Sequence, residues 1–252
     1  MRSEKKHDRK LRVLALLVAV LLAVPAALAD YDAGLAYWKQ GKYQEAAKEW
    51  EAVVANAPDY AFGWFMLGNC YLKLDKYGDA IKPFRKAVEL DPGKFRHHQG
   101  LAQALFKQRK YGEVIEVLDK AENVAQAPKE KKVLYKMRGL ALAQTKDYQR
   151  AQRDLQQAGP GQDHSVASSL AQACFRLDDY TCLRDAAEKA MALKSDDETS
   201  LRLLTRGSLE QARRTRDKTK KKSLYAYAAQ KAQKLVQISS DKANARELHA
   251  AA

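Results

Sequence analysis

The sequence predicts an all-α solenoid of stacked antiparallel helix pairs, and three observations lead to this fold class. Tyrosine recurs at a nearly constant interval, a small residue stands nine positions before each tyrosine, and apolar residues stand three, seven and ten positions after it. The composition agrees, because 252 residues with 46% hydrophobic and 30% charged side chains but only 12 Gly and 6 Pro are typical of a helical globular protein.

The repeat is visible in the spacings between successive tyrosines, which are 34, 34, 37 and 32 residues. The tyrosines are Tyr43, Tyr77, Tyr111, Tyr148 and Tyr180. The small residues that precede them are Gly34, Gly68, Ala102, Gly139 and Ala171. Self-similarity at such a period indicates a repeat architecture in which each unit packs on its neighbours.

Each unit is predicted to be two helices joined by a short turn. In the second unit, four residues at i, i+3, i+4 and i+7 share one helical face: Trp64, Leu67, Gly68 and Tyr71. After the turn, a second face is formed by Ala80, Phe84 and Ala87. We expect the small residue where two helices approach most closely. Helices of about 13 residues are marginal alone, so stacking must stabilise them.

These residues, with Tyr77 and Pro92, resemble the tetratricopeptide repeat family. The resemblance implies a right-handed α-α superhelix, the tetratricopeptide solenoid, with five to six helix pairs. It covers five repeats, which are residues 30–60, 61–94, 95–131, 132–163 and 164–197. The chain departs from the family at Arg138, where leucine is usual, and at Pro83, which removes a backbone hydrogen bond within a helix and can kink it.

The C-terminal part is predicted to form a modified sixth helix pair over residues 198–240, followed by a capping helix or tail over 241–252 that Ser240 and Asp241 begin. A basic insertion or helix extension spans residues 213–222. Its cations are Arg213, Arg214, Arg216, Lys218, Lys220, Lys221 and Lys222. This basic patch is a candidate for docking on anionic membrane lipid or an acidic cell-wall polymer. The alternative is a disordered, solvated linker.

The N-terminus has the pattern of a secretory signal peptide over residues 1–29. A basic start precedes an apolar run over residues 13–24, and small residues precede Asp30. We expect cleavage after Ala29 and export, most simply to a bacterial periplasm. The alternative is an inner-membrane anchor formed by uncleaved residues 11–29, although the apolar run is shorter than the roughly 20 residues that a spanning helix needs. Cleavage would leave 39 basic and 29 acidic residues, a net charge of +10.

The resemblance also implies a partner-binding groove, lined by the first helix of every pair. A column of cations contains Lys39, Lys73, Lys107 and Arg176. Its aromatic and polar neighbours are Trp38, Phe65, Phe106, Phe175, Asn69, Gln103 and Gln172. Such a surface suits a protein or peptide that carries acidic groups or a free C-terminal carboxylate. The alternative is that the cations are merely solvated, with their stems over the aromatics.

The family's carboxylate clamp for heat-shock chaperones is not implied. Asn69 matches one clamp asparagine, but Phe65 and Gly100 stand where the clamp needs a lysine and a second asparagine.

The sequence contains no recognisable catalytic set, so we expect a non-enzymatic scaffold without cofactor or metal. It has no glycine-rich phosphate loop, paired-cysteine metal spacing or nucleophile elbow. His97 and His98 are adjacent, but neighbouring residues of a helix point in different directions, and packing is the favoured role of His98. Cys174 and Cys182 are candidates for a disulfide, with two small apolar fillers as the alternative. Nucleic acid is not an expected partner of an exported protein.

Overall fold

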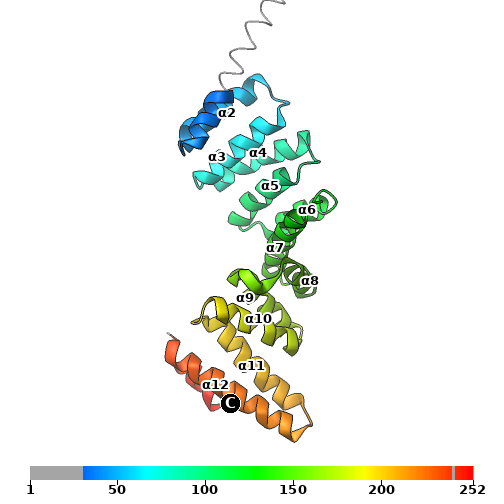
Figure 1. The fold of residues 1–252 in the computed structure, drawn as a ribbon, viewed down its shortest axis with the longest axis vertical. Helices are drawn as coiled ribbons and strands as arrows, with labels where there is room; N and C mark the ends of the chain where they lie inside the picture. Colours follow the sequence, from blue (N-terminus) through cyan, green and yellow to red (C-terminus); the bar gives the residue numbers. More distant parts are fainter. Residues whose placement is uncertain (1–30, 240–241, 252) are drawn as a thin grey trace, which may run out of the picture. The chain divides into compact units, whose positions relative to one another are not determined.

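The computed structural model describes residues 31–239 and 242–251, and the chain divides into two compact units, Met1–Gln108 and Arg109–Ala252. The predicted fold class is confirmed, because helices follow one another in antiparallel pairs of tetratricopeptide type (Figure 1). The signal peptide, its cleavage site and the predicted start of the capping helix at residues 240–241 lie outside the described residues. Within those described residues, no helix is long and apolar enough to cross a membrane.

Unit 1 contains two complete helix pairs and the first helix of a third. Residues 31–39 are helical and are followed by α2 (Tyr43–Asn56), α3 (Ala61–Lys73), α4 (Tyr77–Leu90) and α5 (Phe95–Lys107). The repeat tyrosines begin the second helices, as at α2 and α4. Pro83 lies inside α4, and the helix continues through it to Leu90. The buried core includes Trp50 and Phe84, both fully inaccessible to solvent.

Unit 2 continues the series with longer helices towards its end. It consists of α6 (Tyr111–Ala121), α7 (Pro128–Gln144), α8 (Tyr148–Ala158), the 3-10 turn η1 (Pro160–Gln162), α9 (His164–Arg176), α10 (Tyr180–Leu193), α11 (Glu198–Arg214), α12 (Lys218–Ile238) and α13 (Lys242–Ala250). α11 and α12 have 17 and 21 residues, against 13 and 14 in α9 and α10. The ten residues 213–222 therefore extend this helix pair and include only a three-residue connection, 215–217.

A left-handed residue ends the first helix of successive pairs, two positions before each repeat tyrosine. The positive φ angles are 74° at Gly41, 56° at Asp75, 58° at Arg109, 66° at Lys146 and 57° at Asp178. The next amide donates to the carbonyl five residues back, as in the 2.9 Å bonds from residue 76 to 71 and from 179 to 174. This arrangement closes the helix as a Schellman motif. Glycine fits such a backbone best, yet only the first of these turns has it.

A close approach is seen around Phe84, at Gly68, which was one of the predicted small residues, and at Gly100, which was not. A Cβ atom added to Gly68 would lie 2.9 Å from this ring, and one added to Gly100 would lie 2.4 Å from it. Real Cβ atoms essentially never come within 3.0 Å of another heavy atom. The ring therefore fills the space between α3 and α5, and the residue that each helix places against it is a glycine.

Candidate functional site

In unit 1, the predicted groove aromatics are partly exposed and anchored in the core. The ring of Phe65 lies 6.2 Å from that of Phe62, 6.0 Å from that of Phe84 and 5.1 Å from that of His97. Aromatic pairs at such distances stabilise by about 0.5–1.5 kcal/mol beyond area burial. Asn69 donates its side-chain amide to the carbonyl oxygen of Phe65 at 2.9 Å. Ring contacts therefore hold Phe65 in place, and one amide donor of Asn69 is engaged within α3.

The cations of the predicted column are exposed, and most of them lie over a tyrosine of the preceding helix pair. In unit 1, the Lys73 ammonium is 6.0 Å from the Tyr43 ring centre, and that of Lys107 is 5.6 Å from the Tyr77 ring centre. Unit 2 repeats the contact with the Arg176 guanidinium 6.0 Å from the Tyr148 ring. Exposed cation–π contacts contribute about 0.5–1 kcal/mol. Each of these cations stands four residues before the next repeat tyrosine, which was a sequence signal for the column but not for the contact with the preceding tyrosine.

Arg214 occupies the same position in the α11–α12 pair, although its sequence context placed it in the basic patch. Its guanidinium lies 5.8 Å from the Tyr180 ring and bonds the Asp178 carboxylate at 2.7 Å. That hydrogen bond lowers the pKa of Asp178 and raises the pKa of Arg214. Arg214 is therefore engaged within unit 2.

The remaining predicted groove residues vary in exposure. Lys39 and Gln103 are exposed, while Trp38 is half-buried with its ring 5.0 Å from that of Tyr43. Phe106 and Gln172 are half-buried, and Phe175 packs on the core of unit 2.

Trp64 and His98 share a role that the sequence did not reveal. The Trp64 indole donates to the backbone carbonyl oxygen of Pro58 at 2.9 Å. The Nε2 atom of His98 lies 2.8 Å from the backbone carbonyl oxygen of Pro92. Each side chain therefore contacts the proline six residues before it. The neighbouring His97 Nδ1 lies 3.1 Å from the carbonyl oxygen of Asp91, and burial lowers the pKa of His97. The two histidines thus bond separate backbone carbonyls. Within the described part of the chain, no three metal-ligating residues converge.

Arg138, which departs from the family pattern, is the centre of a buried ion network in unit 2. Its guanidinium forms two bonds with Asp154, at 2.7 and 3.1 Å, and bonds Asp119 at 2.9 Å and Glu122 at 2.7 Å. Burial opposes the charge, but the bonds from Asp154 and Glu122 dominate and raise the pKa of Arg138. The network joins α6, α7 and α8, so its role is structural.

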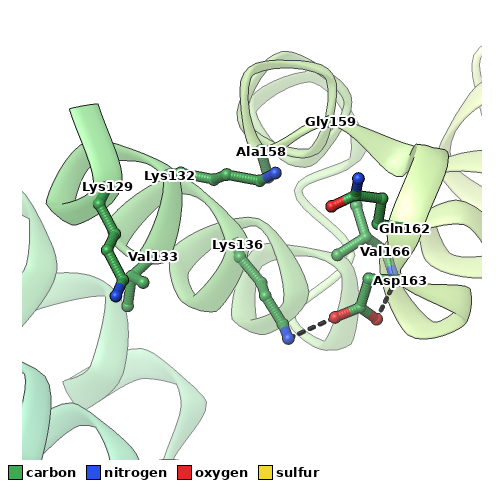
Figure 2. Close-up of a pocket in the computed structure, with 9 residues that line it drawn as sticks. All are labelled: Lys129, Lys132, Val133, Lys136, Ala158, Gly159, Gln162, Asp163 and Val166. Carbon is green, nitrogen blue, oxygen red and sulfur yellow. Dashed lines mark hydrogen bonds and ion pairs between the residues drawn. The ribbon is translucent and has the colours of Figure 1, made fainter.

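A second charged feature of unit 2 is a small cavity between α7, the end of α8 and the start of α9, which we call the lysine pocket (Figure 2). Its cations are Lys129, Lys132 and Lys136, and its volume is about 290 Å³. Lys136 pairs with Asp163, which also accepts the backbone N–H groups of residues 165 and 166 at 3.0 and 3.3 Å. Burial alone would raise the pKa of Asp163, but the hydrogen bonds that Lys136 and Ser165 donate lower this pKa to about 2.

The basic patch lies at one end of the α11–α12 pair. Arg213 pairs with Glu210 at 3.0 Å, and Asp217 caps α12 by accepting the Lys220 backbone N–H at 3.0 Å. Five further cations have no ion pair among the described residues: Arg216, Lys218, Lys220, Lys221 and Lys222. Four of these are lysines in the first turns of α12, where the helix dipole disfavours positive charge.

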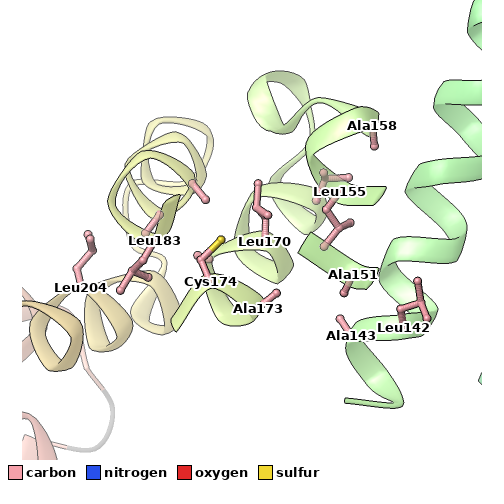
Figure 3. Close-up of a cluster of buried hydrophobic side chains, with 14 residues drawn as sticks. Leu142, Ala143, Ala151, Leu155, Ala158, Leu170, Ala173, Cys174, Leu183 and Leu204 are labelled. Carbon is pink, nitrogen blue, oxygen red and sulfur yellow. The ribbon is translucent and has the colours of Figure 1, made fainter. Parts of the chain in front are cut away.

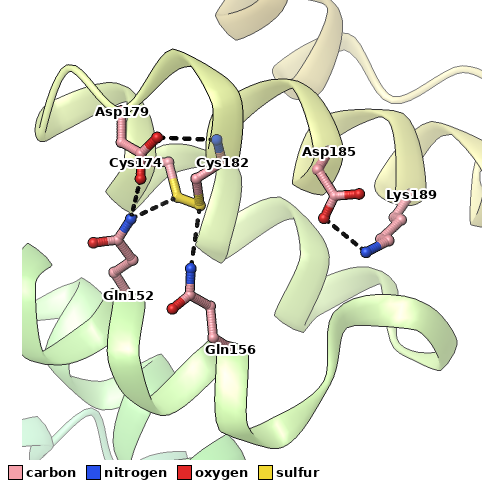
Figure 4. The surroundings of a disulfide bond; sticks show 7 residues. All are labelled: Gln152, Gln156, Cys174, Asp179, Cys182, Asp185 and Lys189. Carbon is pink, nitrogen blue, oxygen red and sulfur yellow. Dashed lines mark hydrogen bonds and ion pairs between the residues drawn. A yellow bond between two sulfur atoms is a disulfide. The ribbon is translucent and has the colours of Figure 1, made fainter.

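The structure joins Cys174 and Cys182 in a disulfide between α9 and α10, with the Cα atoms 5.7 Å apart. Cys174 belongs to the apolar core of unit 2, which also contains Leu170 and Leu183 (Figure 3). The side-chain amide of Gln152 lies 3.5 Å from the Cys174 sulfur (Figure 4). The third cysteine is a buried free thiol in α3, and burial raises its pKa to about 12.

Together, the fold and the family match define the class of this protein: an all-α helical-repeat protein built of antiparallel helix pairs. Residues 31–95 match the tetratricopeptide repeat family, and the helix pairs that follow continue the same arrangement. No curated protein sequence matches the chain.

Solved structures with this fold cover most of the chain. PilF from Pseudomonas aeruginosa has a TM-score of 0.62 and 19% identity over 89% of this chain and 97% of that chain. YrrB, described as a TPR protein with an unusual peptide-binding site, has a TM-score of 0.65 and 14% identity over 80% of this chain and 97% of YrrB. PilW, described as a type IV pilus biogenesis factor, has a TM-score of 0.56 and 14% identity over 87% of this chain and 97% of PilW. At these identities, the similarity establishes the fold.

Proposed function

We propose that the protein is an exported scaffold that binds a protein or peptide partner along the first helices of its pairs. The observation that carries the proposal is the cation column, in which Lys73 and Lys107 are exposed at the same position of consecutive pairs, each over a tyrosine. The ring restricts the ammonium group without neutralising it. An extended partner with acidic groups would therefore meet an ordered positive charge in each of these pairs.

The neighbouring aromatics support a protein or peptide as the partner. Phe62 and Phe65 are held by ring contacts yet keep part of their surface exposed. Rigid aromatic side chains of this kind are favoured anchors in interfaces, because little conformational entropy is lost when they bind.

The groove is tested by reversing charge in the column. Lys73→Glu with Lys107→Glu should abolish capture of the partner identified by crosslinking and mass spectrometry, because two attractive charges become repulsive. The matched control is Lys48→Glu with Lys82→Glu, which makes the same charge change at exposed, equivalent positions of α2 and α4. Capture that survives the first pair, or that is lost equally with the control pair, would contradict the groove.

Export is supported by the N-terminal pattern of residues 1–29 and by the Cys174–Cys182 disulfide, since structural disulfides persist mainly in oxidising compartments. N-terminal sequencing of the periplasmic protein should begin at Asp30. A chain that keeps residues 11–29 and sediments with the inner membrane would instead support the anchored alternative.

A second candidate function is docking on an anionic membrane or cell-wall polymer through the basic patch. It is favoured by the five cations without ion pairs at one end of the α11–α12 pair, which the helices hold together. The protein should sediment with phosphatidylglycerol vesicles at low salt, less so as salt rises, and not with phosphatidylcholine vesicles. Replacing Lys220, Lys221 and Lys222 by glutamine should reduce that binding. Salt-insensitive or absent binding would rule out this function.

A further inference from the structure

We propose that the lysine pocket of unit 2 binds an acidic side chain of a partner segment together with an apolar side chain beside it. This inference rests on the proposed function for its class of partner, a protein or peptide, but it concerns a site separate from the cation column. Sequence reasoning did not single out these lysines, although Lys129, Lys132 and Lys136 follow the i, i+3, i+7 spacing of one helical face.

The first argument is charge. Asp163 is the only acidic residue that lines the pocket, and its carboxylate is already engaged by Lys136 and by the backbone at the start of α9. Lys129 and Lys132 have no ion pair among the residues that the structure describes, so the pocket carries two uncompensated positive charges.

Two other pockets of unit 2 differ from it in this respect. The pocket beside Arg138 is lined by three arginines and three acidic residues. The pocket beside Tyr180 is lined by two basic and two acidic residues. Of these three pockets, only the lysine pocket has a charge that an external anion would balance.

The second argument is the apolar lining and the size. Val133, Ala158 and Val166 come from three different helices and all line the pocket. A volume of about 290 Å³ is at the lower limit of the roughly 300–1,000 Å³ typical of pockets that bind whole small molecules. The pocket therefore suits one or two side chains of a larger partner. Figure 2 shows Lys132 reaching from α7 towards Ala158.

The third argument concerns which anion fits. Phosphate groups and chain-terminal carboxylates are typically held by free backbone N–H groups. Here the amides at the start of α9 already donate to Asp163. The remaining donors are lysine ammonium groups in a pocket that apolar side chains also line, which matches a singly charged carboxylate carried next to an aliphatic side chain.

The test uses short peptides with both ends blocked and NMR titration of the purified protein. In acetyl-Ser-Glu-Ser-Val-Ser-amide, the Glu and Val side chains lie on the same face of an extended chain. This peptide should shift the resonances of residues 129–136 and 158–166 and bind at least about tenfold more tightly than its Gln analogue, because a charge-assisted hydrogen bond is lost. A blocked phosphoserine peptide, and a Gln analogue with a free C-terminus, should bind more weakly than the Glu peptide.

The protein variants complete the test. Replacing both Lys129 and Lys132 by glutamine should reduce the affinity for the Glu peptide about tenfold. Lys120→Gln with Lys131→Gln removes the same charge from exposed positions that do not line the pocket and should leave binding unchanged.

Equal binding of the Glu and Gln peptides, wild-type affinity in the pocket variant, or no saturable binding would overturn the inference. So would tighter binding of the phosphoserine or free-terminus peptide. Failure of this site leaves the proposed function intact if partner capture still depends on Lys73 and Lys107. If that dependence is absent as well, both proposals are wrong.

Discussion

A single methyl group added at Gly100 should destabilise unit 1, because there is no space for it. An alanine Cβ at this position would lie 2.4 Å from Cε1 of Phe84 and 2.8 Å from its Cδ1 and Cζ. The ring cannot retreat freely, because it is fully buried and Gly68 in α3 confines it as well. Overpacking of this kind costs about 1–3 kcal/mol, against a gain of at most about 1 kcal/mol in helix propensity.

The matched control is Gly78→Ala in α4 of the same unit, where the nearest neighbouring atom would be 3.8 Å from the new Cβ. Urea denaturation followed by circular dichroism should find Gly100→Ala about 1–3 kcal/mol less stable than Gly78→Ala. In a Phe84→Leu background, the penalty of Gly100→Ala should largely disappear, since the clashing ring is gone. If Gly100→Ala equals or exceeds Gly78→Ala in stability, close helix approach at glycine does not hold the stack together.

Three further predictions concern charge, backbone strain and pH. Arg138→Leu restores the residue usual in the family but leaves buried Asp154 without its partner, so the free energy of unfolding should fall by about 3–5 kcal/mol. Adding Asp154→Leu should recover most of this loss. If it does not, the ion-network interpretation is wrong. Lys146→Gly should stabilise the protein by about 0.5–1 kcal/mol in urea denaturation, because φ is 66° there, and a loss would argue against strain. Burial lowers the pKa of His97, so below about pH 6.5 the unfolded chain binds a proton that the folded chain does not. The free energy of unfolding should therefore decrease as the pH is lowered through this range. If His97→Gln shows the same pH dependence, His97 is not its cause.

The helices and their pairing were predictable from the sequence because the information is local. The tyrosines that begin the second helices and the small residues at the close approaches recur within each unit, so a period of about 34 residues exposes them. The groove residues could be grouped by the same period, and they remain a prediction. Residues 213–222 were less clear, since a basic run has no apolar period, and the structure shows most of them within two extended helices.

By itself, then, the sequence determined the repeat, the all-α class and some of the close approaches, such as Gly68, but not the tighter one at Gly100. Only the tertiary structure decided which charged side chains meet. Arg138 of α7 pairs with Asp154 of α8, sixteen residues away, and Lys136 of α7 pairs with Asp163, the N-cap of α9, twenty-seven residues away. The physical reason is that apolar periodicity specifies which face of a helix is buried, whereas an ion pair or a pocket depends on the packing of several helices at once.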